Sequence, residues 1–123
     1  MFGIKTCKNG HLMDPSWNVC PTCIAPVKGW LVVLNGKTKN TVYTFHEGKN
    51  KIGTGMDCEI RIRHSGLSRH HAMLKATENG KYYVTDLNSV NGSFVNNFQV
   101  SNREIIDGDI VKFGDLELKF KCL

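Results

Sequence analysis

Ser68-Arg69-His70-His71, followed twenty residues later by Asn91-Gly92, is the most informative part of this chain. Both stretches fall between short segments that have the composition of β-strands, so we expect them to form two separate loops. They supply the hydroxyl of Ser68, the guanidinium of Arg69 and the side-chain amide of Asn91. Together these groups can bind an anionic peptide, because each donates hydrogen bonds and the guanidinium also carries charge.

The chain from Trp30 onwards is a series of short apolar segments separated by turn signals. Asn35-Gly36 and Asn79-Gly80 are strong hairpin signals, and no segment sustains a helical period. This pattern predicts an all-β fold in which two antiparallel or mixed sheets pack face to face as a β-sandwich. The strands expected from β-branched and aromatic content lie at residues 30–34, 41–45, 59–63, 71–75 and 81–85. A further strand is expected at 116–122, where apolar and charged residues alternate.

Three of the five cysteines lie in the first 23 residues and have the spacing of metal ligands. Cys7 and His11 form one pair, and Cys20 and Cys23 form the other. A Cys₃His set fills the tetrahedral shell of one Zn²⁺ ion and suits zinc better than iron, so the spacing predicts a structural zinc ribbon. The alternative is that these cysteines are merely buried and the histidine is a surface residue.

Composition divides the chain and limits its partners. We expect residues 1–28 to form the zinc ribbon and a linker, and residues 29–123 to form the β-sandwich. A formal charge of +5 and a pI near 9.0 favour acidic partners, nucleic acid among them. There is neither a signal-peptide core nor an apolar run of roughly 18–20 residues, which leads us to expect a cytoplasmic protein with no membrane partner.

Three further motifs flank the two loops. Lys51-Ile52-Gly53-Thr54 precedes them, residues 86–96 surround Asn91, and residues 107–114 close the series. In this order and spacing, the motifs resemble those of the forkhead-associated (FHA) family of phosphothreonine-binding modules. The resemblance covers roughly residues 29–123.

The resemblance implies roles for particular residues. Ser68 would donate to the phosphate, and Asn91 would bond the peptide backbone beside the phosphothreonine. His71 would brace the loop without touching the ligand, and Arg69 would brace the loop or reach the phosphate. The expected phosphopeptide-binding residues are Ser68, Arg69, Asn91, Ser89, Thr54 and Arg63, with Gly53, His71 and Gly92 shaping the site loops.

Two positions depart from the family pattern, and both are phosphate contacts. Thr54 stands where an arginine is expected after Ile-Gly, and Val90 stands where a hydroxyl residue is expected before Asn-Gly. Losing one charge-assisted contact weakens binding by roughly 1.5–3 kcal/mol. Arg61, Arg63 or His64 would have to compensate for the missing charge. An FHA fold that acts as a phosphate-independent scaffold is the alternative.

The function expected from these features is that of a non-enzymatic signalling adaptor. Its FHA-like domain would bind a protein phosphorylated on threonine, with no small-molecule substrate. Ser68, His71 and Asp86 invite a hydrolase triad, but no nucleophile-elbow sequence surrounds the serine. The main alternative from another class is nucleic-acid binding through the zinc ribbon and the basic surface.

Overall fold

The computed structural model describes residues 5–6, 12–13 and 26–123. Strands β1 (Lys5–Thr6) and β2 (Leu12–Met13) pair antiparallel as a small two-stranded sheet. None of the described residues belongs to a helix that is long and apolar enough to cross a membrane.

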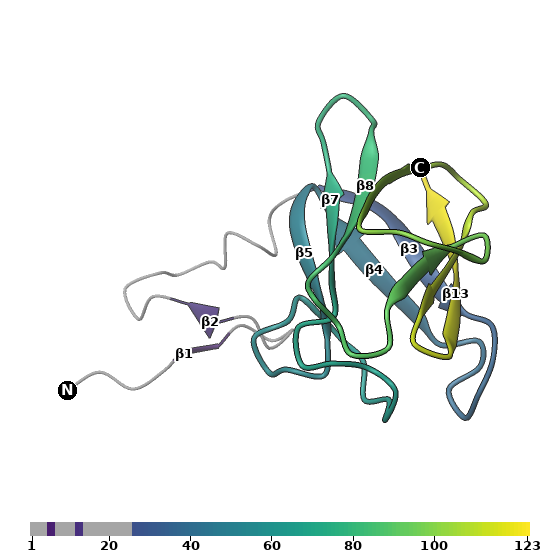
Figure 1. Cartoon of the computed structure of the whole chain (residues 1–123). Helices are drawn as coiled ribbons and strands as arrows, with labels where there is room; N and C mark the ends of the chain where they lie inside the picture. The colour runs from purple at the N-terminus through teal and green to yellow at the C-terminus, as the bar shows by residue number, and fades with distance from the viewer. Residues whose placement is uncertain (1–4, 7–11, 14–25) are drawn as a thin grey trace.

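Residues 26–123 form two sheets, as the strand pattern predicted (Figure 1). The first sheet has six strands in the order β10-β9-β12-β13-β3-β4, and all of its pairs are antiparallel. Its strands are β3 (Val27–Val33), β4 (Val42–His46), β9 (Ser93–Val95), β10 (Phe98–Gln99), β12 (Ile110–Phe113) and β13 (Leu116–Cys122).

The second sheet has five strands in the order β11-β8-β7-β5-β6. Its pairs are antiparallel except β5 with β6, which run parallel. The strands are β5 (Gly48–Gly53), β6 (Ile60–Arg61), β7 (Ala72–Ala76), β8 (Tyr82–Asp86) and β11 (Asn102–Ile105). The sandwich is therefore all-β with mixed pairing, as expected.

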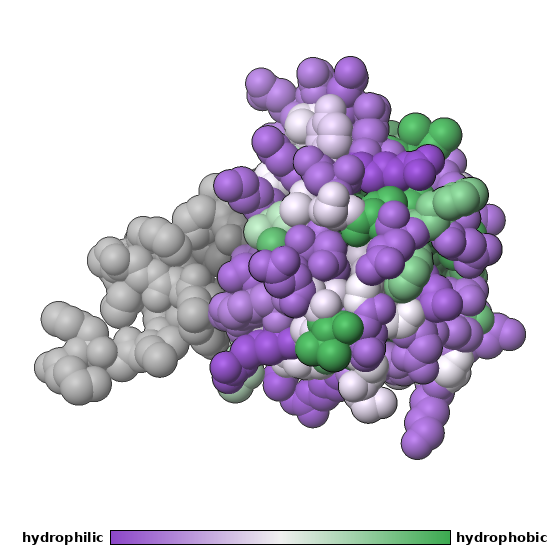
Figure 2. Space-filling model, in the orientation of Figure 1, coloured by the Kyte–Doolittle hydropathy of each residue, from purple (hydrophilic) through white to green (hydrophobic). Residues whose placement is uncertain are grey.

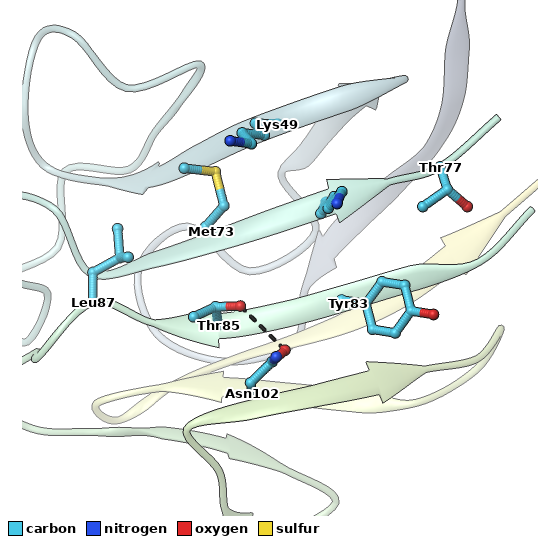
Figure 3. A pocket seen from close by; sticks show the side chains of 8 residues that line it. Lys49, Met73, Thr77, Tyr83, Thr85, Leu87 and Asn102 are labelled. Carbon is cyan, nitrogen blue, oxygen red and sulfur yellow. Dashed lines mark hydrogen bonds between the residues drawn. The ribbon is translucent and has the colours of Figure 1, made fainter.

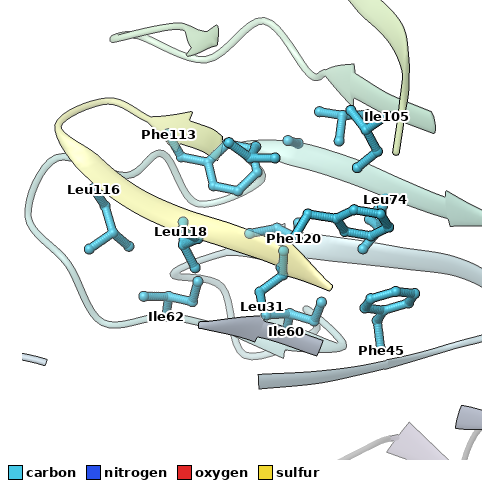
Figure 4. Packing of buried hydrophobic residues seen from close by; sticks show 14 of the residues in the cluster. Leu31, Phe45, Ile60, Ile62, Leu74, Ile105, Phe113, Leu116, Leu118 and Phe120 are labelled. Atoms are coloured by element: carbon cyan, nitrogen blue, oxygen red, sulfur yellow. The ribbon is translucent and has the colours of Figure 1, made fainter. Parts of the chain in front are cut away.

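The core lies between the two sheets (Figure 4). β13 contributes Leu116, Leu118 and Phe120, each fully buried and alternating with more exposed residues. The Phe120 ring stacks on Phe45, with centroids 5.4 Å apart, and meets Tyr82 edge-on at 5.2 Å. Burying these aromatic side chains supplies much of the driving force that holds the sheets together.

Strand composition did not reveal β5, β9, β10, β11 or β12, and β5 is the longest of these strands. Its sequence is rich in Lys, Asn and Gly, which are poor strand formers. Asn50 is buried at its centre, and its amide nitrogen donates to the backbone oxygens of His46 and Leu74 at 2.8 and 3.2 Å. These bonds satisfy a polar side chain inside the sandwich, so tertiary context overrides local propensity.

Two expected boundaries differ in the structure. The strand expected at 59–63 is only two residues long in β6, although the backbone N–H of Ile62 still donates to the Gly53 oxygen at 2.9 Å. β3 begins at Val27, within the segment expected as a linker. Cys122, at the end of β13, is half-buried and packs against the core. Both described cysteines, Cys58 and Cys122, are free thiols.

The two ends of the sandwich carry different loops. The β7–β8 hairpin turns at Asn79-Gly80, as expected, and its tip stands at the top of Figure 1. The loops after β5, before β7 and after β8 lie at the opposite end. The face seen in Figure 2 is largely hydrophilic, with separate small apolar patches.

Candidate functional site

His71 ties the two sequence-predicted loops together at the lower end of the sandwich. The ring is completely buried, and its edge packs on Phe113, with centroids 5.4 Å apart. Nδ1 accepts a hydrogen bond from the Ser68 backbone N–H at 3.0 Å, while Nε2 lies 2.8 Å from the Gly92 carbonyl oxygen. Since a carbonyl only accepts, Nε2 carries the proton and the ring is neutral. His71 thus has the bracing role that the family resemblance implied.

Ser68 is held so that its hydroxyl hydrogen remains available. The hydroxyl oxygen accepts a bond from the Val90 backbone N–H at 3.0 Å, and the side chain is only half-buried. A serine hydroxyl has one donor hydrogen in addition to its acceptor lone pairs. Within the described residues, the Ser68 hydroxyl donates no hydrogen bond. It can therefore donate a hydrogen bond to an anion.

Asn91 lies beside Ser68 and is exposed. One of its amide N–H groups donates to the Gly66 carbonyl oxygen at 2.9 Å, which fixes the direction of the side chain. The side-chain carbonyl and the second N–H remain available for one acceptor and one donor bond. A peptide backbone has one C=O acceptor and one N–H donor, so it can pair with both groups.

The loop that carries Asn91 is braced from below by Asp86. The Asp86 carboxylate accepts bonds from the hydroxyls of Ser89 and Ser93, at 2.5 and 2.6 Å, and from the Ser89 backbone N–H at 3.1 Å. The Ser89 oxygen also accepts from the Gly92 backbone N–H at 3.0 Å. Ser89 was expected to bind the phosphopeptide, but its hydroxyl is used inside the loop, where it supports Asn91 indirectly.

Replacing Asp86 with Asn should cost about 1–3 kcal/mol of stability, because one accepting oxygen becomes an amide donor and either the two serine hydroxyls or the Ser89 backbone N–H lose their acceptor. Burial raises the Asp86 pKa, but the bonds from Ser89 and Ser93 outweigh it and hold the pKa below its usual value. This contribution is therefore complete above the unfolded pKa, near 3.9, and is lost as the pH falls through the folded value. Urea unfolding of the wild type and Asp86→Asn at pH 7 and pH 3 checks this: the difference should shrink in acid, and an unchanged difference contradicts it.

Gly53, at the end of β5, allows the loop after β5 to lie in close contact with the backbone of the Ser68-Arg69 loop. A Cβ at this position would lie 2.1 Å from the Arg69 carbonyl oxygen and 2.9 Å from that of Ser68. The backbone N–H groups of Thr54 and Gly55 donate to these same two oxygens, to Ser68 at 3.2 Å and Arg69 at 3.0 Å. Only glycine allows this approach, so Gly53 sets where Ser68 and Arg69 stand.

The arginines near the site differ in the contacts that they make. The Arg69 and Arg63 side chains are exposed. Arg61, also exposed, donates from Nε to the Thr54 carbonyl oxygen at 3.1 Å. Its guanidinium therefore lies at the backbone of the residue that replaces the family arginine. The sequence suggested Arg61 as a substitute but did not place it at Thr54.

Two histidine–aspartate pairs flank the site. His64 Nε2 lies 2.7 Å from an Asp115 oxygen, and His70 Nε2 lies 2.9 and 3.0 Å from the two oxygens of Asp57. These bonds lower the pKa of both carboxyl groups. An open hollow of about 410 Å³ adjoins Asn91 on the Asp115 side, and it is lined by Ser65, Gly66, Asn91, Phe94, Lys112, Gly114 and Asp115.

A second open hollow, of about 580 Å³, lies on the outer face of the five-stranded sheet (Figure 3). Lys49, Met73 and Tyr83 stand on neighbouring strands there, and Lys49 is directly opposite Lys75 in the β5–β7 register. None of the residues expected to bind the phosphopeptide lines it.

The expected zinc ligands lie outside the described residues. These are Cys7, His11, Cys20 and Cys23. The zinc ribbon therefore stays a prediction.

An all-β sandwich that presents an available hydroxyl, an oriented amide and exposed guanidinium groups from loops at one end has the form of a peptide-recognition module. The FHA domain family model matches residues 50–114, slightly more than half of the chain. The chain belongs to the FHA domain family.

Relatives with known names carry the same domain within longer chains. "FHA domain-containing protein FhaA" of Mycobacterium tuberculosis is 37% identical over 76 residues, which is 62% of this chain and 14% of that protein. "Glycogen accumulation regulator GarA" of the same organism is 29% identical over 97 residues, which is 79% of this chain and 59% of that protein. The chain thus spans less than two thirds of either relative.

Solved FHA structures share the fold. One, from work on phosphothreonine-dependent FHA domain interactions, superposes with a TM-score of 0.69 at 32% identity, over 76% of this chain and 95% of the other. The expectation of an FHA sandwich is thereby confirmed.

Proposed function

We propose that the lower end of the sandwich binds threonine-phosphorylated segments of partner proteins. The observation that carries this proposal is the Ser68 hydroxyl, which is held by the Val90 N–H and keeps its own hydrogen for a phosphate oxygen. Such a charge-assisted bond is about twice as strong as a neutral one. Asn91, fixed on Gly66, pairs with the peptide backbone next to the phosphothreonine.

Arg61 partly replaces the arginine that Thr54 lacks. Its bond to the Thr54 carbonyl oxygen brings a guanidinium to the edge of the phosphate-binding loops. Because Nε makes that bond, only the terminal nitrogens of Arg61 remain to donate to phosphate. Arg69 supplies a second exposed guanidinium from the Ser68 loop. We therefore expect phosphate-dependent binding that is weaker than a cradle with a dedicated arginine would give.

The hollow beside Asn91 can hold a residue of the bound segment that lies near the phosphothreonine. Its lining combines the Phe94 ring with Lys112, whose ammonium group stands 5.5 Å from the ring centroid. This surface favours a residue that is apolar or acidic.

The protein acts as an adaptor and not as an enzyme. In a serine hydrolase the histidine takes the proton of the serine hydroxyl. Here the His71 acceptor nitrogen is bonded to the Ser68 backbone N–H, and the other nitrogen faces the Gly92 oxygen. Both ring nitrogens are therefore engaged, so a triad of Ser68, His71 and Asp86, already disfavoured by the sequence, would have no general base. Among the described residues, the free cysteines Cys58 and Cys122 fit the reducing cytoplasm, where we place the protein.

A binding screen of the full chain tests this function. It compares a degenerate phosphothreonine peptide library with the same library in unphosphorylated form. We expect enrichment of phosphorylated sequences only. Equal enrichment of both libraries would favour a phosphate-independent scaffold. Indifference to both, with nucleic-acid affinity that falls steeply with salt, would favour the nucleic-acid alternative.

We further propose that residues 1–28 hold one structural Zn²⁺ through Cys7, His11, Cys20 and Cys23. The support is the donor set and its spacing, which fill a tetrahedral shell. Metal binding should supply most of the folding free energy of so short a segment.

Replacing Cys20 with Ser should release this zinc and leave the sandwich folded, because the sandwich has a core of its own. Native mass spectrometry counts the metal, and amide spectra report the fold. A Cys20→Ser chain that keeps all the zinc of the wild type would refute the ligand assignment. Cys122→Ser is the matched control and should keep the full count.

A further inference from the structure

A cluster of three metal-ligating side chains lies next to the recognition loop, on residues that the proposed function does not use. Asp57, Cys58 and His70 each point one donor atom into the same small volume, and these atoms all lie within 4.8 Å of one another. Two come from the loop after β5 and one from the loop before β7. The donors are a carboxylate oxygen, a thiol sulfur and an imidazole nitrogen.

The two loops that carry the cluster are already fixed to each other. The Arg69 carbonyl oxygen accepts from the Gly55 backbone N–H at 3.0 Å and from the Cys58 thiol at 3.3 Å. The Cys58 backbone N–H donates in turn to Gly55 at 3.2 Å. The sulfur is buried, whereas the Asp57 and His70 side chains are 43% and 42% exposed. The sulfur thus forms the floor of the cluster, and the other two donors stand at its open rim.

We propose that Asp57, Cys58 and His70 bind a Zn²⁺ ion, with water as the fourth ligand. Zinc accepts nitrogen, sulfur and oxygen donors together in a tetrahedron, which few other common ions do. The imidazole nitrogen that now faces the Asp57 carboxylate would bind the metal in place of that contact. On binding, the thiol S–H bond breaks, an S–Zn bond forms and the proton leaves to solvent.

Two features of the surroundings oppose a bound dication, and zinc binding can offset each of them. Burial and the charge of Asp57 raise the pKa of the Cys58 thiol, and a metal reverses that effect by attracting the thiolate. Lys51 Nζ lies 3.5 Å from one Asp57 oxygen. The carboxylate has two oxygens, so one can bind zinc while the other keeps the lysine as an outer partner.

Zinc at this position would lock the Ser68-Arg69 segment to the loop after β5. His70 follows Arg69 directly, and Asp57 lies three residues after Thr54. The ion would also add positive charge near a cradle that lacks one arginine.

Titration of the full chain with zinc chloride, followed by native mass spectrometry, tests the site. We expect the wild type to bind one more zinc ion per chain than Asp57→Asn, His70→Gln or Cys58→Ser, or to bind that ion at least about tenfold more tightly. The cysteines and histidine at positions 7–23 are unchanged in every variant, so the difference does not depend on the proposed zinc ribbon. The His70 ring nitrogen resonance should shift on zinc addition.

Two variants of matched chemistry serve as controls. Cys122→Ser removes the other free thiol of the sandwich, and His64→Gln removes the histidine of the other aspartate pair. Both should bind the same number of zinc ions as the wild type. Because Asp57 and His70 are exposed, their variants stay folded even if Cys58→Ser does not. Equal zinc binding in the wild type, Asp57→Asn and His70→Gln would overturn the proposal.

Discussion

A Gly53→Ala variant should lose about 3 kcal/mol of stability, at the upper end of what an added methyl group usually costs in a packed site. The added Cβ would lie 2.1 Å from the Arg69 carbonyl oxygen, which is backbone and cannot swing away. The strand end and the recognition loop must then separate, which breaks the bonds from Thr54 and Gly55 to the oxygens of Ser68 and Arg69. Urea unfolding measures the loss.

Gly80→Ala is the matched control. Gly80 has φ +83°, and no atom lies within 4 Å of its added Cβ. This substitution meets only the strain of the left-handed backbone, roughly 1–2 kcal/mol. If Gly53→Ala costs no more than Gly80→Ala, the close contact of the two loops is not what holds the site.

Thr54→Arg should tighten binding of a phosphothreonine peptide by about tenfold or more. The new guanidinium would add one charge-assisted contact worth roughly 1.5–3 kcal/mol, which corresponds to about 10- to 150-fold in affinity. Thr54 is already placed against the Ser68 loop by its backbone bond of 3.2 Å. Calorimetric titration of both proteins with one selected peptide gives the ratio.

Thr44→Arg separates this contact from a general effect of charge. Thr44 is exposed on β4, in the other sheet, so the substitution adds the same charge away from the loops. It should change the affinity by much less than Thr54→Arg does. Equal tightening in both variants would mean that net charge alone sets the affinity, and that Thr54 does not face the phosphate.

The sequence allowed prediction of the parts whose cause is local. The alternation along β13 reports burial on one face, and the Asn79-Gly80 turn has the chemistry of a hairpin. The roles of Ser68, His71 and Asn91 came from ordered motifs. Ordered motifs can identify loop residues even where, as at Thr54 and Val90, single positions depart from the family pattern.

The parts that could not be predicted depend on contacts between distant segments. β5 is a strand because its backbone pairs with β7 and β6, and the side chain of Asn50 finds backbone acceptors at His46 and Leu74. Arg61 reaches Thr54 only because β6 pairs parallel with β5. The Ser89 hydroxyl bonds Asp86 and Gly92, a use that its place beside the Asn91 motif does not show.

The measurement that tests the central claim most directly is a calorimetric titration of the full chain with one selected peptide in two forms, phosphorylated and unphosphorylated on its threonine, repeated with Ser68→Ala. We expect the wild type to prefer the phosphorylated form by at least about tenfold, and Ser68→Ala to lose most of that preference, because the hydroxyl held by Val90 donates to the phosphate. Equal affinity of the wild type for the two forms would contradict the claim that this end of the sandwich binds phosphothreonine.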